Sequence, residues 1–286
     1  KNRYNRILNY LNQLQVEITE PPSYEKITIN LAKSLSQRLK NTNLITAEAL
    51  KKELELSQLR VATGRFLIVT ISTIVLYTYC LSIINSFVAF LPTTTIIAIP
   101  LMFLFSLALI YFMFSTGYPA SFFGITLKNW RRSSIEGILW SVPVMILIVL
   151  LKWLMIHFFS YKHALFEGPG AAIHNLSLFM TMIFILSYSI MTPLQELIVR
   201  GAIQGSLQNF LTGKYRILSS IIISNLIFGM AHLHLSLSSG IAVFVFGLYW
   251  GWMYARQKNL IGVSISHILI GGWAFFVVGV QHILIR

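Results

Sequence analysis

Seven apolar runs, each close to the length that crosses a lipid bilayer, follow one another through most of this 286-residue chain. A transmembrane helix needs roughly 20 apolar residues, because each residue rises about 1.5 Å and the hydrocarbon core is about 30 Å thick. A mean hydropathy of +0.71 and a charged fraction of 11% agree with membrane insertion. The sequence therefore predicts an all-α fold, a polytopic transmembrane helix bundle, with spans at about 66–90, 96–116, 135–157, 175–199, 217–235, 238–256 and 260–283.

Residues 1–65 are polar and hold 11 of the 22 Lys and Arg residues and six of the nine Glu residues. Pro21-Pro22 is expected to separate two helices, and a third helix is expected from about Thr46 to Arg65, running on into the first span. The sequence thus predicts a cytoplasmic helical linker or collar at 1–65 and a transmembrane domain at 66–286; a solvated linker is the alternative for 1–65. The apolar residues at helical spacing are Ile7, Leu8, Leu11 and Leu14, then Ile27, Leu31 and Leu35.

Basic residues in the connections between spans predict the orientation of the chain. The N-terminal segment and three alternate loops are basic, whereas the opposite loops carry only Lys162, with Arg286 at the C-terminal end. Because basic loops stay on the cytoplasmic side, we expect an integral membrane protein with a cytoplasmic N-terminus. A composition rich in Ile, Asn and Lys suggests a bacterial inner or plasma membrane. The basic loop residues are Lys128, Arg131, Arg132, Lys214, Arg216, Arg256 and Lys258.

The formal net charge of +13 bears on the partners of the chain. In a membrane protein a basic excess is typical of cytoplasmic loops that contact anionic lipids, so nucleic acid is not expected as a partner. The chain starts at Lys1 rather than Met, and a helix is expected to run from the N-terminal segment into the first span. A sensor domain upstream, or a partner that binds through residues 1–65, is therefore a further expectation.

An acidic and a basic residue interrupt the fourth apolar run. Glu196 and Arg200 lie one helical turn apart, and the only other glutamates beyond residue 65 are Glu136 and Glu167. Charged groups at membrane depth are costly, so they usually face a protein interior or a water-filled cavity and serve a function there. A glutamate four residues before an arginine is also the favourable order for an ion pair on a helix. The alternative is a structural ion pair.

Two further apolar runs each contain a histidine. His232 ends the segment Ile-Phe-Gly-Met-Ala-His, which contains Phe228, and His267 lies in Ser-Ile-Ser-His. A single intramembrane histidine is more often a satisfied core residue than a catalyst, but one Glu and two His in separate spans indicate a site. A turn near Gly213 would place Glu196 and His232 at a similar depth, whereas His267 lies nearer the end of its span.

At this point the chain resembles the CPBP family, which comprises the CAAX proteases and the bacteriocin-processing (Abi) intramembrane endopeptidases. The family motifs are Glu-Glu-x-x-x-Arg, Phe-x-x-x-His and His-x-x-x-Asn, and the resemblance covers roughly residues 115–286. It implies a bundle of membrane helices around a cavity that opens toward the cytoplasm. The residues that match the motifs by position are Gln195, Glu196, Arg200, Phe228, His232, His267 and Gly271.

The resemblance also implies a role for each motif. In active members the first glutamate and the His of the second motif activate a water molecule, the His and Asn of the third motif stabilise the oxyanion, and the Arg orients the glutamates. Carried over by position, His232 would help to activate water, His267 would bind the oxyanion, and Arg200 would hold Glu196. The substrate would be a peptide or protein segment at the membrane, of which a prenylated CAAX tail is one option.

Two positions depart from the family motifs. Gln195 stands where the first glutamate would be, and an amide does not act as a general base at neutral pH. Gly271 stands where the Asn would be, which removes a side-chain donor. Glu196 is then the expected base, although adjacent helix residues point about 100° apart, so it would approach the water from another direction.

A metal ion is a further possibility, although no cofactor is firmly implied. Glu196, His232 and His267 form a set of one carboxylate and two imidazoles that is workable for a divalent metal such as zinc. His234 would face another way on a helix and is not expected as a ligand. The prototype of the family is viewed as a glutamate-dependent hydrolase without an obligatory metal.

Two functions follow from these observations. The leading hypothesis is an intramembrane endopeptidase of the CPBP type, with Glu196, Arg200, His232 and His267 as its catalytic residues. The alternative is a catalytically degenerate pseudoprotease that binds a peptide or a signalling partner, as Gln195 and Gly271 suggest. A small-solute transporter is disfavoured, because such folds usually have paired broken helices and matching halves, and only Pro193 marks a break here.

Overall fold

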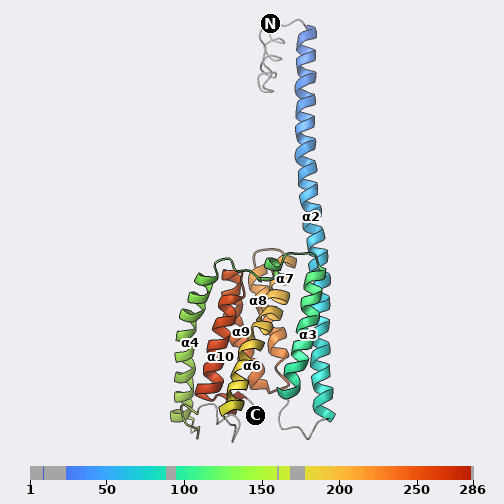
Figure 1. Ribbon diagram of the computed structural model, residues 1–286. Helices are drawn as coiled ribbons and strands as arrows, with labels where there is room; N and C mark the ends of the chain where they lie inside the picture. The colour runs from blue at the N-terminus through green and yellow to red at the C-terminus, as the bar shows by residue number, and fades with distance from the viewer. Residues whose placement is uncertain (1–8, 10–23, 88–94, 160, 168–177, 285–286) are drawn as a thin grey trace. The chain divides into compact units, whose positions relative to one another are not determined.

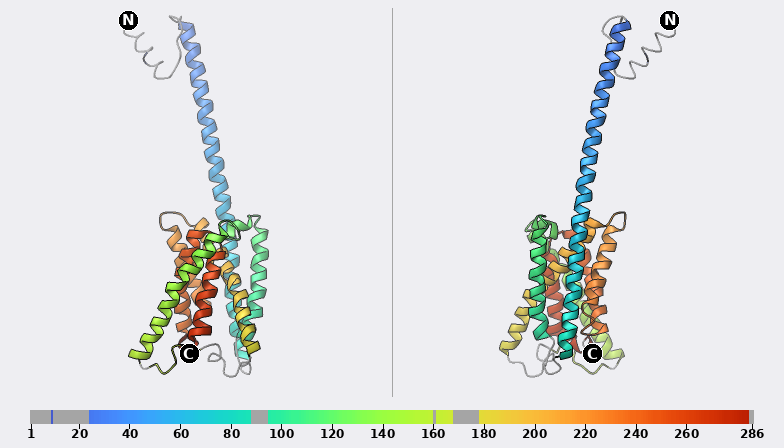
Figure 2. Two further views of the ribbon diagram at one scale, coloured as in Figure 1. Left: turned by 60° about the vertical axis from the view of Figure 1, so that its left-hand side comes forward. Right: turned by 90° about the vertical axis from the view of Figure 1, so that its right-hand side faces the viewer.

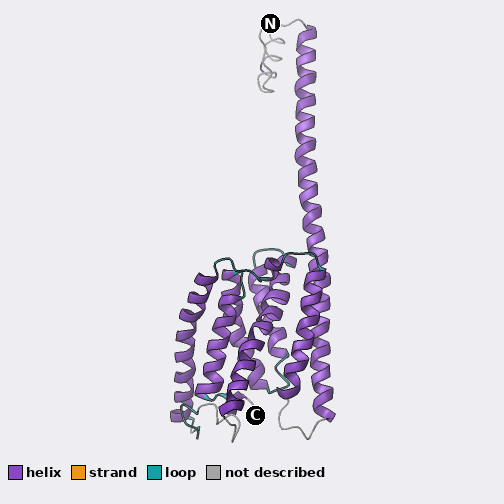
Figure 3. Ribbon diagram, in the orientation of Figure 1, coloured by secondary structure: helices purple, strands orange, loops and turns teal. Residues whose placement is uncertain are grey.

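The computed structural model describes residues 9, 24–87, 95–159, 161–167 and 178–284, and every regular element within these ranges is helical (Figures 1 and 3). The predicted all-α helix bundle is thereby confirmed. The elements are α2 (Tyr24–Phe87), α3 (Thr95–Ser115), η1 (Ala120–Phe123), α4 (Trp130–Phe158), α6 (Leu178–Glu196), η2 (Leu197–Gly205), α7 (Ser206–Phe210), α8 (Arg216–Met230), α9 (Leu237–Gln257), α10 (Ile261–Trp273), η3 (Ala274–Val278) and α11 (Gln281–Leu284).

Helix α2 is a single helix of 64 residues. The prediction of a separate helix beginning near Thr46 is therefore wrong, and the reason is visible in the sequence. Between Tyr24 and Gly64 the chain contains neither proline nor glycine, so nothing in that stretch ends a helix. By its contacts the chain divides into two units, residues 1–59 and 60–286. The predicted helix at 7–14 and the Pro21-Pro22 break lie outside the described residues.

Five helices in the described ranges are long and apolar enough to cross a membrane. Two shorter apolar helices, Pro100–Ser115 and Arg216–Met230, coincide with the second and fifth predicted spans. The chain is thus an integral membrane protein whose helices fall where the apolar runs predict them. The five long segments are Tyr24–Ile84, Trp130–Phe158, Phe179–Phe210, Leu237–Gln257 and Ile261–Val278.

The fifth apolar run ends as a helix earlier than predicted. Helix α8 stops at Met230, and residues 231–235 form turns, so the expected helix to residue 235 is wrong. A new helix starts after these turns. Ser236 starts α9, because its Oγ accepts a hydrogen bond from the backbone N–H of Ser239 at 2.9 Å, a favourable N-cap. His232 therefore lies in a turn rather than on a helix.

Helices α4 and α10 lie side by side in both figures that show the bundle from different sides (Figures 1 and 2). Their backbones come close together at Gly137: a Cβ atom built on this residue would lie 2.5 Å from the carbonyl oxygen of Gly262. Small residues allow such close approach in membranes, where packing rather than the hydrophobic effect holds helices together. The two hydroxyls of Ser141 and Ser266 are hydrogen-bonded across the same interface at 2.9 Å.

We expect Gly137→Ala to lower the free energy of unfolding by about 1–3 kcal/mol, the usual penalty for overpacking a tight contact. Backbone atoms of α10 cannot move aside as a flexible side chain can. Thermal denaturation in one detergent would measure the change. Gly272→Ala is the matched control, because a Cβ at Gly272 would have no atom within 4 Å. Equal melting temperatures for the two variants would contradict the close approach.

Several polar contacts join the loops at one end of the bundle. Arg256 pairs with Glu136 at 2.8 Å, and Lys258 is hydrogen-bonded to Gln208. Asn259 Nδ2 donates to the carbonyl of Lys128 at 3.2 Å. Three of the connections predicted to be cytoplasmic therefore meet at the same end of the bundle. Which side of the membrane this end faces, and its contact with anionic lipids, stay predictions.

Candidate functional site

The central polar residues lie where α6 changes its hydrogen-bonding pattern. Helix α6 ends at Glu196 and continues without a loop into η2, a π-helical turn that runs from Leu197 to Gly205. Pro193 lacks an N–H and Gly201 and Gly205 are poor helix formers, so the α-helical pattern is weak at this point. Turns of this kind are frequently found at functional sites.

Glu196 and Arg200 form an ion pair inside the protein. The Arg200 Nε atom donates to Glu196 Oε2 at 3.0 Å, and both side chains are 0% exposed. A second guanidinium nitrogen, Nη1, donates to Gln204 Oε1 at 3.2 Å and to Asn225 Oδ1 at 2.9 Å. Gln204 in turn donates to the carbonyl of Gly251 at 2.8 Å. The arginine thus connects η2 with α8 and, through Gln204, with α9.

His267 is the third member of this buried cluster. Its Nδ1 atom lies 2.6 Å from Glu196 Oε1, and an ionised carboxylate only accepts, so Nδ1 carries the proton and donates. The ring stacks on Trp250, with centroids 3.8 Å apart. The sequence-predicted residues Glu196, Arg200 and His267 are therefore brought together, although they come from different elements.

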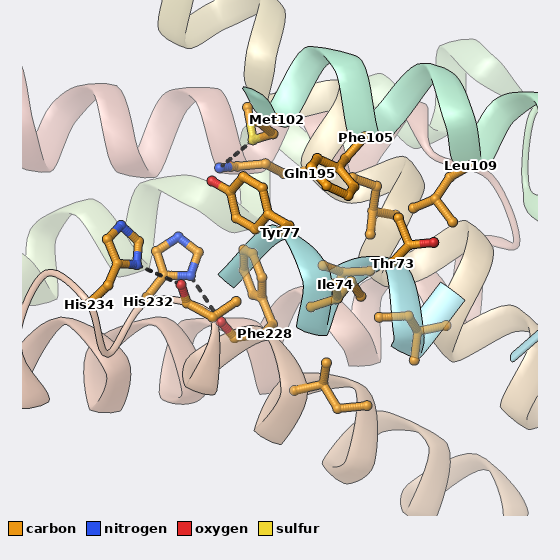
Figure 4. A pocket seen from close by; sticks show the side chains of 15 residues that line it. Thr73, Ile74, Tyr77, Met102, Phe105, Leu109, Gln195, Phe228, His232 and His234 are labelled. Atoms are coloured by element: carbon orange, nitrogen blue, oxygen red, sulfur yellow. Dashed lines mark hydrogen bonds between the residues drawn. The ribbon is translucent and has the colours of Figure 1, made fainter. Parts of the chain in front are cut away.

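A cavity of about 90 Å³ lies beside this cluster (Figure 4). Helices α2 and α3 form one side of it, and η2 and α8 form the other. Most of the lining is apolar, and the polar side chains gather around Gln195, Tyr77, His232 and His234, which Figure 4 shows near one another. The remaining lining residues are Thr73, Ile74, Met102, Phe105, Leu109, Ile198, Val199, Ile203, Ile227, Phe228 and Ala231.

The adjacent residues Gln195 and Glu196 face different surroundings. Gln195 lines the cavity, and its Nε2 lies 3.6 Å from the sulfur of Met102. Glu196 is not among the lining residues, and its two oxygens accept from Arg200 and His267. The chain therefore presents an amide to the cavity and keeps its carboxylate in the interior.

His232 faces the cavity with a defined tautomer. Its Nδ1 lies 2.9 Å from the carbonyl oxygen of Phe228, which can only accept, so Nδ1 carries the proton in the neutral ring. The Nε2 atom is then left with a lone pair for a ligand. The Phe228 ring lies edge-on to both histidines, with centroids 4.8 Å from His232 and 6.5 Å from His267. Phe228 thus stands between the cavity and the buried cluster.

The expectation that His234 would face away from His232 is wrong. Both histidines line the cavity, and their ring centroids are 6.4 Å apart. The reason is that residues 231–235 form turns, so helical spacing does not apply to them. His234 Nδ1 lies 2.8 Å from the carbonyl of Ala231, which fixes its ring as well.

Glu196, His232 and His267, the set considered as possible metal ligands, do not converge in the structure. Within the described ranges no group of three His, Cys, Asp or Glu side chains is arranged to hold a metal ion. Glu196 is engaged by Arg200 and by His267 Nδ1, whereas His232 faces the cavity across the Phe228 ring. A metal would need these three groups to turn toward one point.

Residues 178–273 match the family model described as Rce1-like, type II CAAX prenyl endopeptidase Rce1-like. This match supports CPBP-family membership and agrees with the resemblance carried by the motifs. No curated protein and no solved structure matches the chain. The matched segment spans α6 to α10 and so contains Gln195, Glu196, Arg200, His232 and His267.

Several residues of the site are not predicted from the sequence. Helices α2 and α3 lie outside the matched segment, yet Thr73, Tyr77 and Met102 line the cavity beside Gln195. The residue types within an apolar run do not indicate which of its side chains line a cavity. Asn225 and Gln204 could have been predicted as members of the buried cluster, because an amide side chain within an apolar run usually has a buried polar partner.

Proposed function

We propose that this CPBP-family protein binds a peptide segment within the membrane and does not hydrolyse it by the glutamate-dependent route. The observation that carries the proposal is the amide of Gln195 at the cavity, beside His232. A general base must lie within hydrogen-bond reach of the water it activates, and an amide does not accept a proton at neutral pH. The role of Glu196 in this proposal is structural.

The lining of the cavity supports a peptide as the ligand. A peptide backbone alternates donors and acceptors, and Gln195 supplies both an N–H donor and a carbonyl acceptor. His232 Nε2 supplies an acceptor, while side chains such as Ile74 and Leu109 offer apolar contact. Pockets with apolar walls and a few placed polar groups are typical of binding sites.

The test is binding of fluorescent peptides from a diverse library to the full chain in detergent, measured by anisotropy with cleavage followed in the same wells. We expect saturable binding without cleavage. Thr73→Trp should abolish binding by filling the cavity, whereas Ser72→Trp, on the exposed neighbour in α2, should leave it intact. Equal binding by both variants would place the peptide elsewhere, and cleavage by the wild type would reject the proposal.

A second candidate is proteolysis that uses a different base. The contact between Glu196 Oε1 and His267 Nδ1 favours it, because a carboxylate that holds Nδ1–H leaves the Nε2 lone pair of a histidine free to take a proton. His267→Gln would abolish cleavage in that case, while peptide binding at Gln195 and His232 would remain. Cleavage unaffected by His267→Gln would reject this candidate.

A further inference from the structure

Tyr188 of α6 occupies space that a side chain at position 271 would need. A Cβ atom built on Gly271 would lie only 1.8 Å from the Tyr188 hydroxyl oxygen and 2.9 Å from its Cζ. This is the shortest such distance at any described glycine of the chain. The next residue, Gly272, has no atom within 4 Å of the same ideal position. With Tyr188 in this position, only glycine can occupy position 271 without a change in the surrounding structure.

This contact lies one helical turn from His267. Gly271 follows His267 by four residues in α10, so both lie on the same face of that helix. Tyr188 precedes Glu196 in α6 by two turns, and Thr192 Oγ1 bonds to the Tyr188 carbonyl at 2.8 Å between them. Helices α6 and α10 thus meet at two polar points, Tyr188 with Gly271 and Glu196 with His267.

The tyrosine ring is held in place on several sides. Its hydroxyl donates to the carbonyl oxygen of His267 at 3.4 Å, a long bond that contributes little. The ring lies edge-on to His267 at 6.4 Å, and to Phe275 and Phe276 at 6.3 and 6.0 Å. Because the hydrogen bond is weak, the tyrosine is held mainly by the contacts of its side chain with these neighbours.

We propose that Tyr188 is a positioning residue for His267. By filling the space over Gly271, the ring fixes how closely α6 approaches α10, and this separation allows His267 Nδ1 to reach Glu196. The bond between Nδ1–H and the carboxylate selects the tautomer of His267. The inference concerns the buried cluster and does not require that a peptide be bound or cleaved.

The test is ¹⁵N NMR of the full chain in detergent with ¹⁵N-labelled histidine, in which the resonances of His267 are assigned by their loss in His267→Gln. The wild type should show a protonated Nδ1. Gly271→Ala should shift the Nδ1 resonance toward that of an unprotonated nitrogen, because the added methyl pushes Tyr188 and α6 away. Gly272→Ala is the control and should leave the spectrum of His267 unchanged.

Substitutions at Tyr188 separate positioning from general destabilisation. Tyr188→Phe loses the hydroxyl but keeps the ring, whose Cζ by itself lies 2.9 Å from the Cβ position of Gly271, so it should keep the wild-type spectrum. Tyr188→Leu should shift the spectrum as Gly271→Ala does. The double variant of Tyr188→Leu with Gly271→Ala should resemble Tyr188→Leu alone, since coupled residues are not additive. A wild-type Nδ1 signal in folded Tyr188→Leu would overturn the proposal. Failure of peptide binding would leave these spectra unchanged, so the two proposals fail separately.

Discussion

Replacing Arg200 by methionine is expected to lower the free energy of unfolding by about 3–5 kcal/mol, the usual penalty for removing one partner of a buried ion pair. Glu196 would remain with a charge that only His267 offsets, and the carbonyl oxygens of Gln204 and Asn225 would lose their donor. Methionine keeps the unbranched stem of arginine as far as the fourth side-chain atom, so the space left behind is confined to the position of the guanidinium group. Thermal denaturation in detergent, or unfolding by a denaturing detergent, would measure the change.

Arg132→Met is the control for the loss of an arginine from an ion pair. Arg132 pairs with Glu136 at 2.9 Å with the same spacing of four residues, but its side chain is 81% exposed. An exposed pair of this kind contributes roughly 0–1 kcal/mol, so we expect almost no change in stability. If Arg200→Met were as stable as Arg132→Met, the interior position of the Glu196 pair would be refuted.

The change Gln195→Glu is expected to produce peptide hydrolysis in a chain that otherwise only binds. It would place a carboxylate in the cavity beside His232 without altering the size of the side chain. A positioned general base typically contributes a factor of about 10²–10⁴ in rate. Cleavage of bound library peptides, followed by fluorescence and by mass spectrometry of the products, would measure the gain.

Two further variants show whether such a gain comes from the cavity. Gln195→Met keeps the length of the side chain and should remain inactive. In the Gln195→Glu background, His232→Ala should remove the new activity, because the second group that contacts the water would be lost. A Gln195→Glu protein that binds peptides but never cleaves them would show that more than the base is missing, and Gly271 would be the next position to examine.

The membrane fold and the central ion pair could be predicted from particular residues. Apolar runs of about 20 residues have few alternatives to membrane helices, because lipid leaves backbone polar groups no other partners. Glu196 and Arg200 were identified because charges are costly at that depth and their spacing suits a helix.

Contacts between helices could not be predicted in the same way. The fit of Tyr188 over Gly271 and the cavity walls from α2 and α3 depend on how helices pack, which a single sequence does not specify. The direction of Gln195 and Glu196 was also beyond the sequence, since both are polar and either one could have faced a cavity. Local rules failed at residues 231–235, where turns between α8 and α9 replace the helical spacing on which the assignment of His234 depended.

The π-helical turn from Leu197 to Gly205 changes the direction in which side chains point around the helix axis. Hydrogen bonds from residue i to i+5 enclose one more residue than those of an α-helix, so side chains before the turn are rotated relative to those after it. One residue of offset in an α-helix corresponds to about 100°, which is the angle between Gln195 and Glu196. Inserting one residue into this turn, or deleting one, would thus change which side chain lines the cavity. The rotation of the helix and the identity of the residue together determine which chemical group the cavity contains.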